Sequence, residues 1–294
     1  MDKNNKGKSM AEQEDRFWGE IALRTNDVSK APLYASDNEI VLFARGQTNC
    51  WDLSKLTSSD SLIHQPDVDL ISGVHTPYSY AGHSGTTFCF HKEDSDLCSV
   101  NYHHEGESKF WYGVPDSEGN KLQCLIQEIA RKLKISCSQY VRHKNIMIPP
   151  SVLKAYDIQY TRNVQKPGEF VISFSGGFHQ GFNVGFNLNS AVNFADNRRL
   201  HFYPRFELCD CKYSMIPRKI HASLAAIVKK FSNLSSDATT PIEISLPTKT
   251  PTKFQCPKCP SIYFYARGLK EHIGKIHSEF ILRYACFKLS NGKT

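Results

Sequence analysis

The sequence lacks any run of about 18 consecutive apolar residues, the minimum length for a membrane-spanning helix. Its first residues, MDKNNKGKSMAEQEDR, are polar and contain no apolar core of a signal peptide, so we expect no secretory leader. No internal repeat is visible. These absences favour a reducing, intracellular setting, in which paired cysteines are metal ligands before they are disulfides.

The sequence contains ten cysteines, and in a reducing compartment the paired ones are best explained as metal ligands. Hydrophobic residues make up 40% and aromatic residues 12% of the 294 residues, which is typical of a folded globular protein. The net charge of +7 fits a chromatin or nucleic-acid setting. It fits an ordinary basic protein equally well, so charge alone does not decide the function.

The chain divides into five segments by composition. We expect a disordered N-terminus over residues 1–16, a globular domain over 17–231, a Ser/Thr/Pro-rich linker over 232–253, a compact module over 254–278 and a tail over 279–294. Short runs of aromatic and branched residues between turn residues predict a domain that is mainly β. Apolar residues at helical spacing predict helices over 118–134 and near 218–231.

The compact module has the ligand spacing of a zinc finger. Its pattern is C-x2-C-x12-H-x4-H, formed by Cys256, Cys259, His272 and His277. Two thiolates from a tight turn and two imidazoles from one helix face give the tetrahedral set that zinc prefers. A module this short needs the metal to fold, so we expect a small ββα finger. A lone finger is equally suited to docking a protein and to contacting DNA, which Arg267, Lys270 and Lys275 would permit.

A second candidate metal site combines two histidines and a carboxylate. His91 and Glu93 are two residues apart in a strand-like context, where alternate side chains share a face. His179 follows the strand-like run EFVISF in a glycine-rich turn, which gives its imidazole room. Two imidazoles and one carboxylate form the facial triad of non-haem iron(II) oxygenases. H-x-E alone is a weak signal, because a histidine on a strand is more often an ordinary polar residue.

The surrounding sequence strengthens this interpretation. From Gly73 to Phe194 it resembles the JmjC (Jumonji C) family of histone lysine demethylases, through the stretches GVHTPYSYAG, TTFCFHKED, SVNYHHEGESKFWYGVP, VQKPGEFVISF and FHQGFNVGFNLNSAVNFA. The resemblance implies a double-stranded β-helix, a cupin-like jelly-roll barrel. It also implies Fe(II) at His91, Glu93 and His179, with 2-oxoglutarate as cosubstrate.

The resemblance assigns further residues one at a time. Lys109 falls on the lysine that pairs with the distal carboxylate of 2-oxoglutarate, and Asn101, Phe88 and Trp111 fall on other walls of that pocket. Lys144 falls on a lysine near the path of dioxygen. The positions that match the methyl-lysine pocket are Gly73, Tyr78, Tyr80, Ala191 and Asn193. Without the resemblance, most of these would be ordinary core or strand residues.

A second cysteine set points to one subfamily. Cys137, His143, Cys209 and Cys211 make a three-cysteine, one-histidine set that suits structural Zn(II). The same set, similarly placed, occurs in the demethylases that act on trimethyl-lysine of the histone H3 tail. Phe43 is a departure, because it stands where the family places a tyrosine that contacts 2-oxoglutarate. The JmjN region usual in this subfamily is not recognisable.

The leading hypothesis is a nuclear, Fe(II)- and 2-oxoglutarate-dependent demethylase of di- and trimethyl-lysine in the histone H3 tail. One alternative is a chromatin-binding regulator with a catalytically weak or inactive barrel. The other is a protein hydroxylase built on the same barrel. The sequence does not indicate the oligomeric state or which histone lysine is used.

Overall fold

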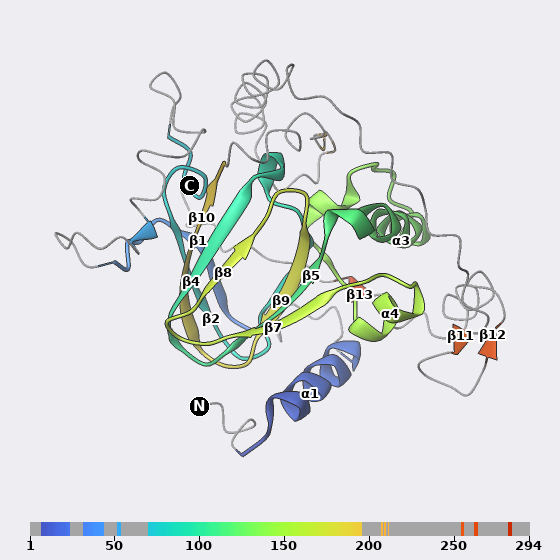
Figure 1. The fold of residues 1–294 in the computed structure, drawn as a ribbon, viewed down its shortest axis with the longest axis horizontal. Helices are drawn as coiled ribbons and strands as arrows, with labels where there is room; N and C mark the ends of the chain where they lie inside the picture. Colours follow the sequence, from blue (N-terminus) through green and yellow to red (C-terminus); the bar gives the residue numbers. More distant parts are fainter. Residues whose placement is uncertain are drawn as a thin grey trace.

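A computed structural model describes residues 7–23, 32–43, 52–53, 70–195, 207, 209 and 211, and the backbone of three short strands beyond them. Two antiparallel sheets face each other and form the barrel drawn in Figure 1. One sheet has the strand order β1-β2-β10-β4-β8, and the other has the order β3-β9-β5-β7. Every pairing within both sheets is antiparallel, as in a double-stranded β-helix. The predicted fold class is therefore confirmed.

The strands of the first sheet are β1 (Tyr34–Asn38), β2 (Tyr78–Gly82), β10 (Asn187–Phe194), β4 (Cys98–Gly106) and β8 (Phe170–Ser173). Those of the second are β3 (Thr87–His91), β9 (Phe178–Asn183), β5 (Lys109–Val114) and β7 (Thr161–Gln165). In β5 and β9, odd-numbered residues face the barrel interior. Even-numbered residues such as Phe110, Tyr112 and Phe182 face outward into a buried apolar cluster.

Helices cover that outer face. The predicted helix over 118–134 is present as α3 (Gly119–Lys132), whose buried side includes Leu122, Leu125, Ile126 and Ile129. It packs with the short α4 (Pro150–Ala155) and with Phe90 and Phe178 from β3 and β9. Figure 1 shows α3 beside the barrel, outside the second sheet. The helix expected near 218–231 lies outside the described residues.

The N-terminal segment corrects one expectation. Residues 10–16, expected to be disordered, belong to helix α1 (Met10–Leu23). Its start is fixed by a capping box: the Ser9 amide donates to the Glu12 carboxylate at 2.7 Å, and the Glu12 amide donates to the Ser9 hydroxyl at 3.3 Å. The sequence contains this Ser-x-x-Glu pattern, although the polar composition of the segment suggests disorder.

Helix α1 is anchored to the outer face of the second sheet. The Phe17 ring stacks on Phe182 with centroids 3.6 Å apart, and Ile21 is fully buried. Glu14 accepts hydrogen bonds from Tyr112 at 2.6 Å and from Arg162 at 2.7 Å. The helix therefore covers β9, β5 and β7, three strands whose inner faces carry site residues (Figure 1).

The C-terminal part of the chain is described only in short pieces. β11 (Phe254–Gln255) and β12 (Ile262–Tyr263) form an antiparallel pair, and β13 (Leu282–Arg283) pairs with β6 (Ile146–Met147). Cys256, Cys259, His272 and His277, the predicted finger ligands, lie outside the described residues. Among the helices that are described, none is long and apolar enough to cross a membrane.

Candidate metal centre and its surroundings

An irregularity in β3 aims His91 into the barrel. Phe88 lies opposite Gly181 and His91 lies opposite His179, so β3 carries one residue more than β9 between these pairs. Such a bulge breaks the alternation of side chains. Cys89 and Phe90 consequently both pack into the outer apolar clusters, although they are consecutive. Phe88 and His91 can then both face inward.

Glu93 reaches the same place by a turn rather than by strand periodicity. β3 ends at His91, and Glu93 is the residue before the short 3-10 helix η2 (Asp94–Asp96). Its carboxylate accepts a hydrogen bond from Ser99 at 2.6 Å and one from Asn193 at 3.1 Å. His91 and Glu93 therefore approach each other, although Glu93 lies beyond the end of β3 and does not share a strand face with His91.

His179 lies on strand β9, and not in the glycine-rich turn in which the sequence placed it. It pairs across the sheet with His91, and the two rings have centroids 4.2 Å apart. The His179 Nε2 atom lies 3.3 Å from the nearer Glu93 oxygen. One ligand atom from each of the three residues falls within 4.8 Å of the others, so this cluster could hold one metal ion.

The donor chemistry of this cluster fits a divalent metal. The His91 Nδ1 atom lies 2.7 Å from the Cys89 carbonyl and must donate to it, which leaves Nε2 as a lone-pair ligand. Burial lowers the pKa of His91 to about 3, so the ring is neutral at physiological pH. Burial also disfavours the Glu93 carboxylate, but the hydrogen bond and charge of His179 outweigh it and hold that pKa well below its usual value. A neutral imidazole at His91 and an ionised carboxylate at Glu93 are the forms in which these side chains bind a metal.

Lys109 is a buried cation on the same inner face. Only 2% of it is exposed, and burial lowers the pKa of its ammonium to about 7. Its Nζ atom lies 5.3 Å from the Phe88 ring centre and 5.8 Å from that of Trp111. These two rings lie 6.4 and 5.7 Å from the His179 ring. The aromatic pair therefore connects the cation to the metal-ligand cluster.

The position of Phe88 depends on a glycine. A Cβ atom at Gly181 would lie 2.0 Å from the Phe110 carbonyl oxygen and 2.3 Å from the Phe88 ring. Both distances are impossible, so a side chain at 181 would force Phe88 out of its present position. Gly181 belongs to the site although the sequence analysis did not select it.

Gln165 is a second residue that the sequence analysis missed. It is fully buried on β7, where its Oε1 accepts from Trp111 Nε1 at 2.9 Å. Its Nε2 lies 3.2 Å from Asn101 Oδ1, to which Asn189 also donates at 3.1 Å. Because two donors bind this oxygen, the amide nitrogen of Asn101 points away from Gln165 and Asn189. β7 is polar and short, so no apolar pattern marked it as a strand.

Phe43 lies near the outer face of the first sheet. Its ring is 4.8 Å from His104 and 5.9 Å from Tyr102, which lie on β4 with side chains opposite to that of Asn101. It packs with Leu53, Val100 and Val192 in a small apolar cluster. This corrects the expectation that Phe43 stands in the cosubstrate pocket: its apolar ring packs into the cluster on the opposite face of the sheet from Asn101.

The five residues expected around a methyl-lysine lie close together. Tyr78 pairs with Ala191 across β2 and β10, and Tyr80 is two residue pairs further along, opposite Asn189. Gly73 adopts a φ of +82°, and its carbonyl accepts from the Asn193 amide at 3.1 Å. Asn193 also donates its side-chain amide to Glu93, so it supports the metal-ligand cluster directly.

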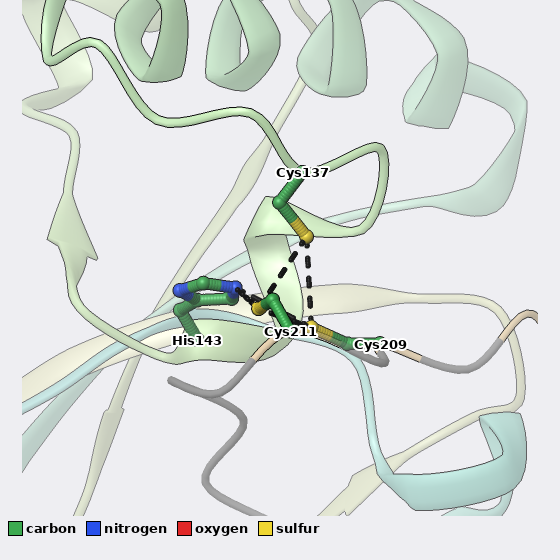
Figure 2. Close-up of side chains that lie close together, drawn as sticks. All are labelled: Cys137, His143, Cys209 and Cys211. Carbon is green, nitrogen blue, oxygen red and sulfur yellow. Dashed lines mark hydrogen bonds between the residues drawn. The ribbon is translucent and has the colours of Figure 1, made fainter.

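The other cysteine and histidine residues form a second cluster. Cys137 precedes the 3-10 helix η4 (Tyr140–His143) and His143 is its last residue, while Cys209 and Cys211 approach them from a distant part of the chain (Figure 2). Contacts among the three sulfurs and His143 Nε2 measure 2.9–3.9 Å. A tetrahedral zinc site has sulfur–sulfur edges of about 3.8 Å, so the set fits one such ion.

Two acidic residues of η2 meet basic residues that flank this second cluster. Lys144, at a left-handed φ of 51°, lies 3.5 Å from Asp94. Burial disfavours its charged form, but Asp94 and Glu93 outweigh this and raise the pKa of Lys144. Arg142 lies 3.1 Å from Asp96, with both side chains buried.

Comparison with known proteins gives a consistent result. Residues 78–194 match the family model described as "JmjC domain, hydroxylase". The chain is 38% identical over 203 residues to probable lysine-specific demethylase 4F of Homo sapiens, which covers 69% of this chain and 31% of that protein. It is 37% identical over 198 residues to lysine-specific demethylase 4D of Rattus norvegicus, covering 67% of this chain and 38% of that protein.

A third relative, lysine-specific demethylase 4B of Mus musculus, is 36% identical over 203 residues, which is 69% of this chain and 18% of that protein. The matched region spans well under half of each relative's length. All ligand atoms of the first metal cluster lie inside the family match, whereas Cys209 and Cys211 lie beyond its end.

Proposed function

Because the chain carries a JmjC domain over residues 78–194, we propose that it is an Fe(II)- and 2-oxoglutarate-dependent demethylase of methyl-lysine in the histone H3 tail. The observation that carries this proposal is the cluster of His91, Glu93 and His179, linked through two aromatic rings to the buried Lys109. The names of the relatives, all lysine-specific demethylases, support the choice of substrate.

In this proposal the triad holds Fe(II), and 2-oxoglutarate lies between the metal and Lys109. When bound, iron and its cosubstrate supply the oxidising power for hydroxylation of an N-methyl group. Lys109 pairs its ammonium with the distal carboxylate, and burial among apolar rings strengthens that attraction. Asn101 offers its amide N–H to the cosubstrate, in the orientation that Gln165 and Asn189 impose.

The remaining assignments concern substrate and metals. Tyr78, Tyr80, Gly73 and Ala191 would surround the methylated ammonium with hydroxyl, carbonyl and aromatic groups. The small Ala191 leaves room for di- and trimethyl forms. Lys144 stays charged beside Glu93 and would act near the dioxygen path. Zn(II) would occupy the cluster of Cys137, His143, Cys209 and Cys211, and a second Zn(II) the C-terminal finger.

We further propose a nuclear location, where the finger contacts DNA or a protein partner. The net charge of +7 and the basic residues of the finger favour DNA. This part of the proposal rests on sequence alone, because the finger ligands lie outside the described residues.

One experiment separates the candidate functions. The full chain is incubated with Fe(II), 2-oxoglutarate, ascorbate and a panel of methylated histone H3 peptides, and peptide mass and formaldehyde are followed. Stepwise loss of CH2 equivalents together with formaldehyde is expected. A gain of one oxygen atom without formaldehyde would instead identify a protein hydroxylase.

The matched control is His179→Ala, which removes one metal ligand from a described strand. Demethylation that survives this change unaltered would contradict the assignment of the metal site. Absence of turnover with every peptide would favour the second candidate, a chromatin-binding protein with a weak or inactive barrel. The observation favouring that candidate is Phe43, which contacts His104 on the face of the first sheet opposite to Asn101 and so makes no contact with the proposed cosubstrate pocket. A pocket without the tyrosine hydroxyl of the family lacks one hydrogen bond to a charged group, worth about 1.5–3 kcal/mol, and would bind the cosubstrate more weakly.

A further inference from the structure

The turn that follows Glu93 has an unfavourable backbone that its surroundings must hold in place. Ser95 and Asp96 are consecutive non-glycine residues in the left-handed region, with φ angles of 54° and 51°. Such conformations persist only where neighbouring structure fixes them. The Asp96 amide donates to the Glu93 carbonyl at 3.0 Å, so the turn sets the direction in which the Glu93 side chain leaves the backbone.

The groups that fix this turn come largely from the segment that carries the second cluster. The Arg142 guanidinium lies 3.1 Å from Asp96, with the side chains 5% and 3% exposed respectively. Lys92 approaches the other oxygen of Asp96 at 3.5 Å. Both side chains of the Arg142–Asp96 pair are removed from water, so solvent screens the interaction far less than it screens a surface pair.

Arg142 is also held by the second cluster, because it directly precedes His143. The His143 Nε2 atom lies 2.9 Å from the Cys211 sulfur and 3.4 Å from that of Cys209. A metal bound at these four ligands fixes η4, and with it the backbone that carries Arg142. A continuous path then runs from Cys137 and His143 through Arg142 and Asp96 to Glu93.

We propose that Arg142 is a positioning residue that couples the two metal clusters, so that an ordered cysteine–histidine cluster increases the affinity of the His91–Glu93–His179 site for its metal. This inference rests on the proposed function, which makes both clusters metal sites. The coupling is reciprocal, because binding at either site must then favour binding at the other by the same factor.

The test is a double-mutant cycle on the full chain, read out as the Kd for Mn(II), a redox-stable probe of the triad, with no turnover required. The variants are Arg142→Gln, Cys137→Ser and the combination of the two. Partners of metal-binding residues typically change affinity by about 10- to 100-fold, so each single change is expected to weaken Mn(II) binding at least tenfold. The double variant is expected to be little weaker than either single variant, because both interrupt one path.

Three controls keep the result interpretable. Lys121→Gln breaks an exposed ion pair with Glu118 and is expected to leave Mn(II) affinity unchanged. Arg142→Lys keeps the charge and is expected to restore part of the affinity; Asp96→Asn replaces Arg142→Gln in the cycle if that variant does not fold. Asp96→Asn probes the same pair from the other side with little change in shape.

The outcomes separate the two ideas. If Mn(II) binds the native chain but not His179→Ala, and Arg142→Gln binds it as tightly as the native chain, the coupling is refuted while the proposed function stands. Full multiplication of the two single effects would also refute the coupling. If the native chain shows no Mn(II) binding that depends on His179, the proposed metal site fails and the coupling fails with it.

Discussion

At the scale of single residues, the candidate site consists of a few charged groups whose protonation is set by burial and by neighbouring charges. Lys109 is the clearest case, since burial alone lowers the pKa of its ammonium to about 7. Its partner in the proposed complex is a carboxylate, which would restore the charged form. The residue that we propose to pair with the cosubstrate therefore has a pKa close to physiological pH in the free protein.

Binding of 2-oxoglutarate is consequently expected to depend on pH. Below about pH 7 Lys109 is already charged, so binding takes up little proton. Above about pH 7 the Lys109 amine of the free protein is neutral, and binding must take up one proton. The affinity for 2-oxoglutarate should therefore fall about tenfold per pH unit. Calorimetry with the Mn(II)-loaded chain in buffers of different ionisation enthalpy measures this proton uptake directly. Uptake near zero at pH 8 would contradict the prediction.

Gln165 should determine the orientation of Asn101. Gln165→Glu keeps an acceptor for Trp111 but replaces the donor that faces Asn101 Oδ1. In this variant the introduced carboxylate and Asn101 Oδ1 would be two acceptors facing each other. Rotation of the Asn101 amide by half a turn relieves this contact, but it points the amide N–H away from the cosubstrate. We expect the KM for 2-oxoglutarate to rise about tenfold, roughly one hydrogen bond to a charged group. The matched control, Gln123→Glu on the exposed face of α3, should leave KM unchanged.

At the scale of elements, the sequence indicated well what apolar patterning controls and poorly what polar contacts control. Helix α3 was predicted to within a few residues because its buried side repeats at helical spacing. Helix α1 was missed, since its stability comes from a cap at Ser9 and from Glu14 contacts with residues far along the chain. His179 was recognised, but strand β9 was not, because its glycines resemble a turn until Phe88 and Phe110 are seen to need the space.

The contribution of α1 can be measured at Phe17. This ring is 4% exposed and stacks on Phe182, so Phe17→Ala leaves a cavity against β9. Substitutions of this kind cost about 3–5 kcal/mol, and we expect a loss near 3 kcal/mol in urea unfolding. Phe186→Ala, at a site that is 52% exposed, is the control and should change stability by less than about 0.5 kcal/mol. Equal effects of the two changes would show that α1 does not stabilise the barrel.

At the scale of the whole molecule, the chain combines a net charge of +7 with a proposed substrate, the histone tail, that is itself basic. Long-range electrostatics therefore favours nucleic acid over the free peptide. The proposed finger, outside the described residues, adds a second contact that is suited to DNA. Affinity for chromatin would then be supplied largely by DNA and chemical selectivity by the barrel.

Salt dependence should separate these two contributions. Affinity for duplex DNA is expected to fall steeply between low and physiological salt, because each phosphate contact releases counterions. The KM for a methylated H3 peptide should stay level or improve over the same range, because salt screens the repulsion between like charges. Fluorescence anisotropy with labelled DNA and steady-state kinetics with the peptide provide the two measurements. Parallel weakening of both would contradict this division.

The single additional residue in β3, between Phe88 and His91, has a consequence for protein design. Transferring the segment from Phe88 to Glu93 onto a regular strand would keep the sequence of the motif but lose its geometry. In an unbroken alternation, Phe88 and His91 would point to opposite sides of the sheet. Deleting either Cys89 or Phe90 would restore that alternation and bring the strand back into step with β9. Phe88 and the imidazole would then form a regular i, i+2 pair on the inner face, but one of the two residues that fill the outer apolar clusters would be lost. A design that copies this metal centre would therefore have to reproduce the β-bulge as well as the residue types.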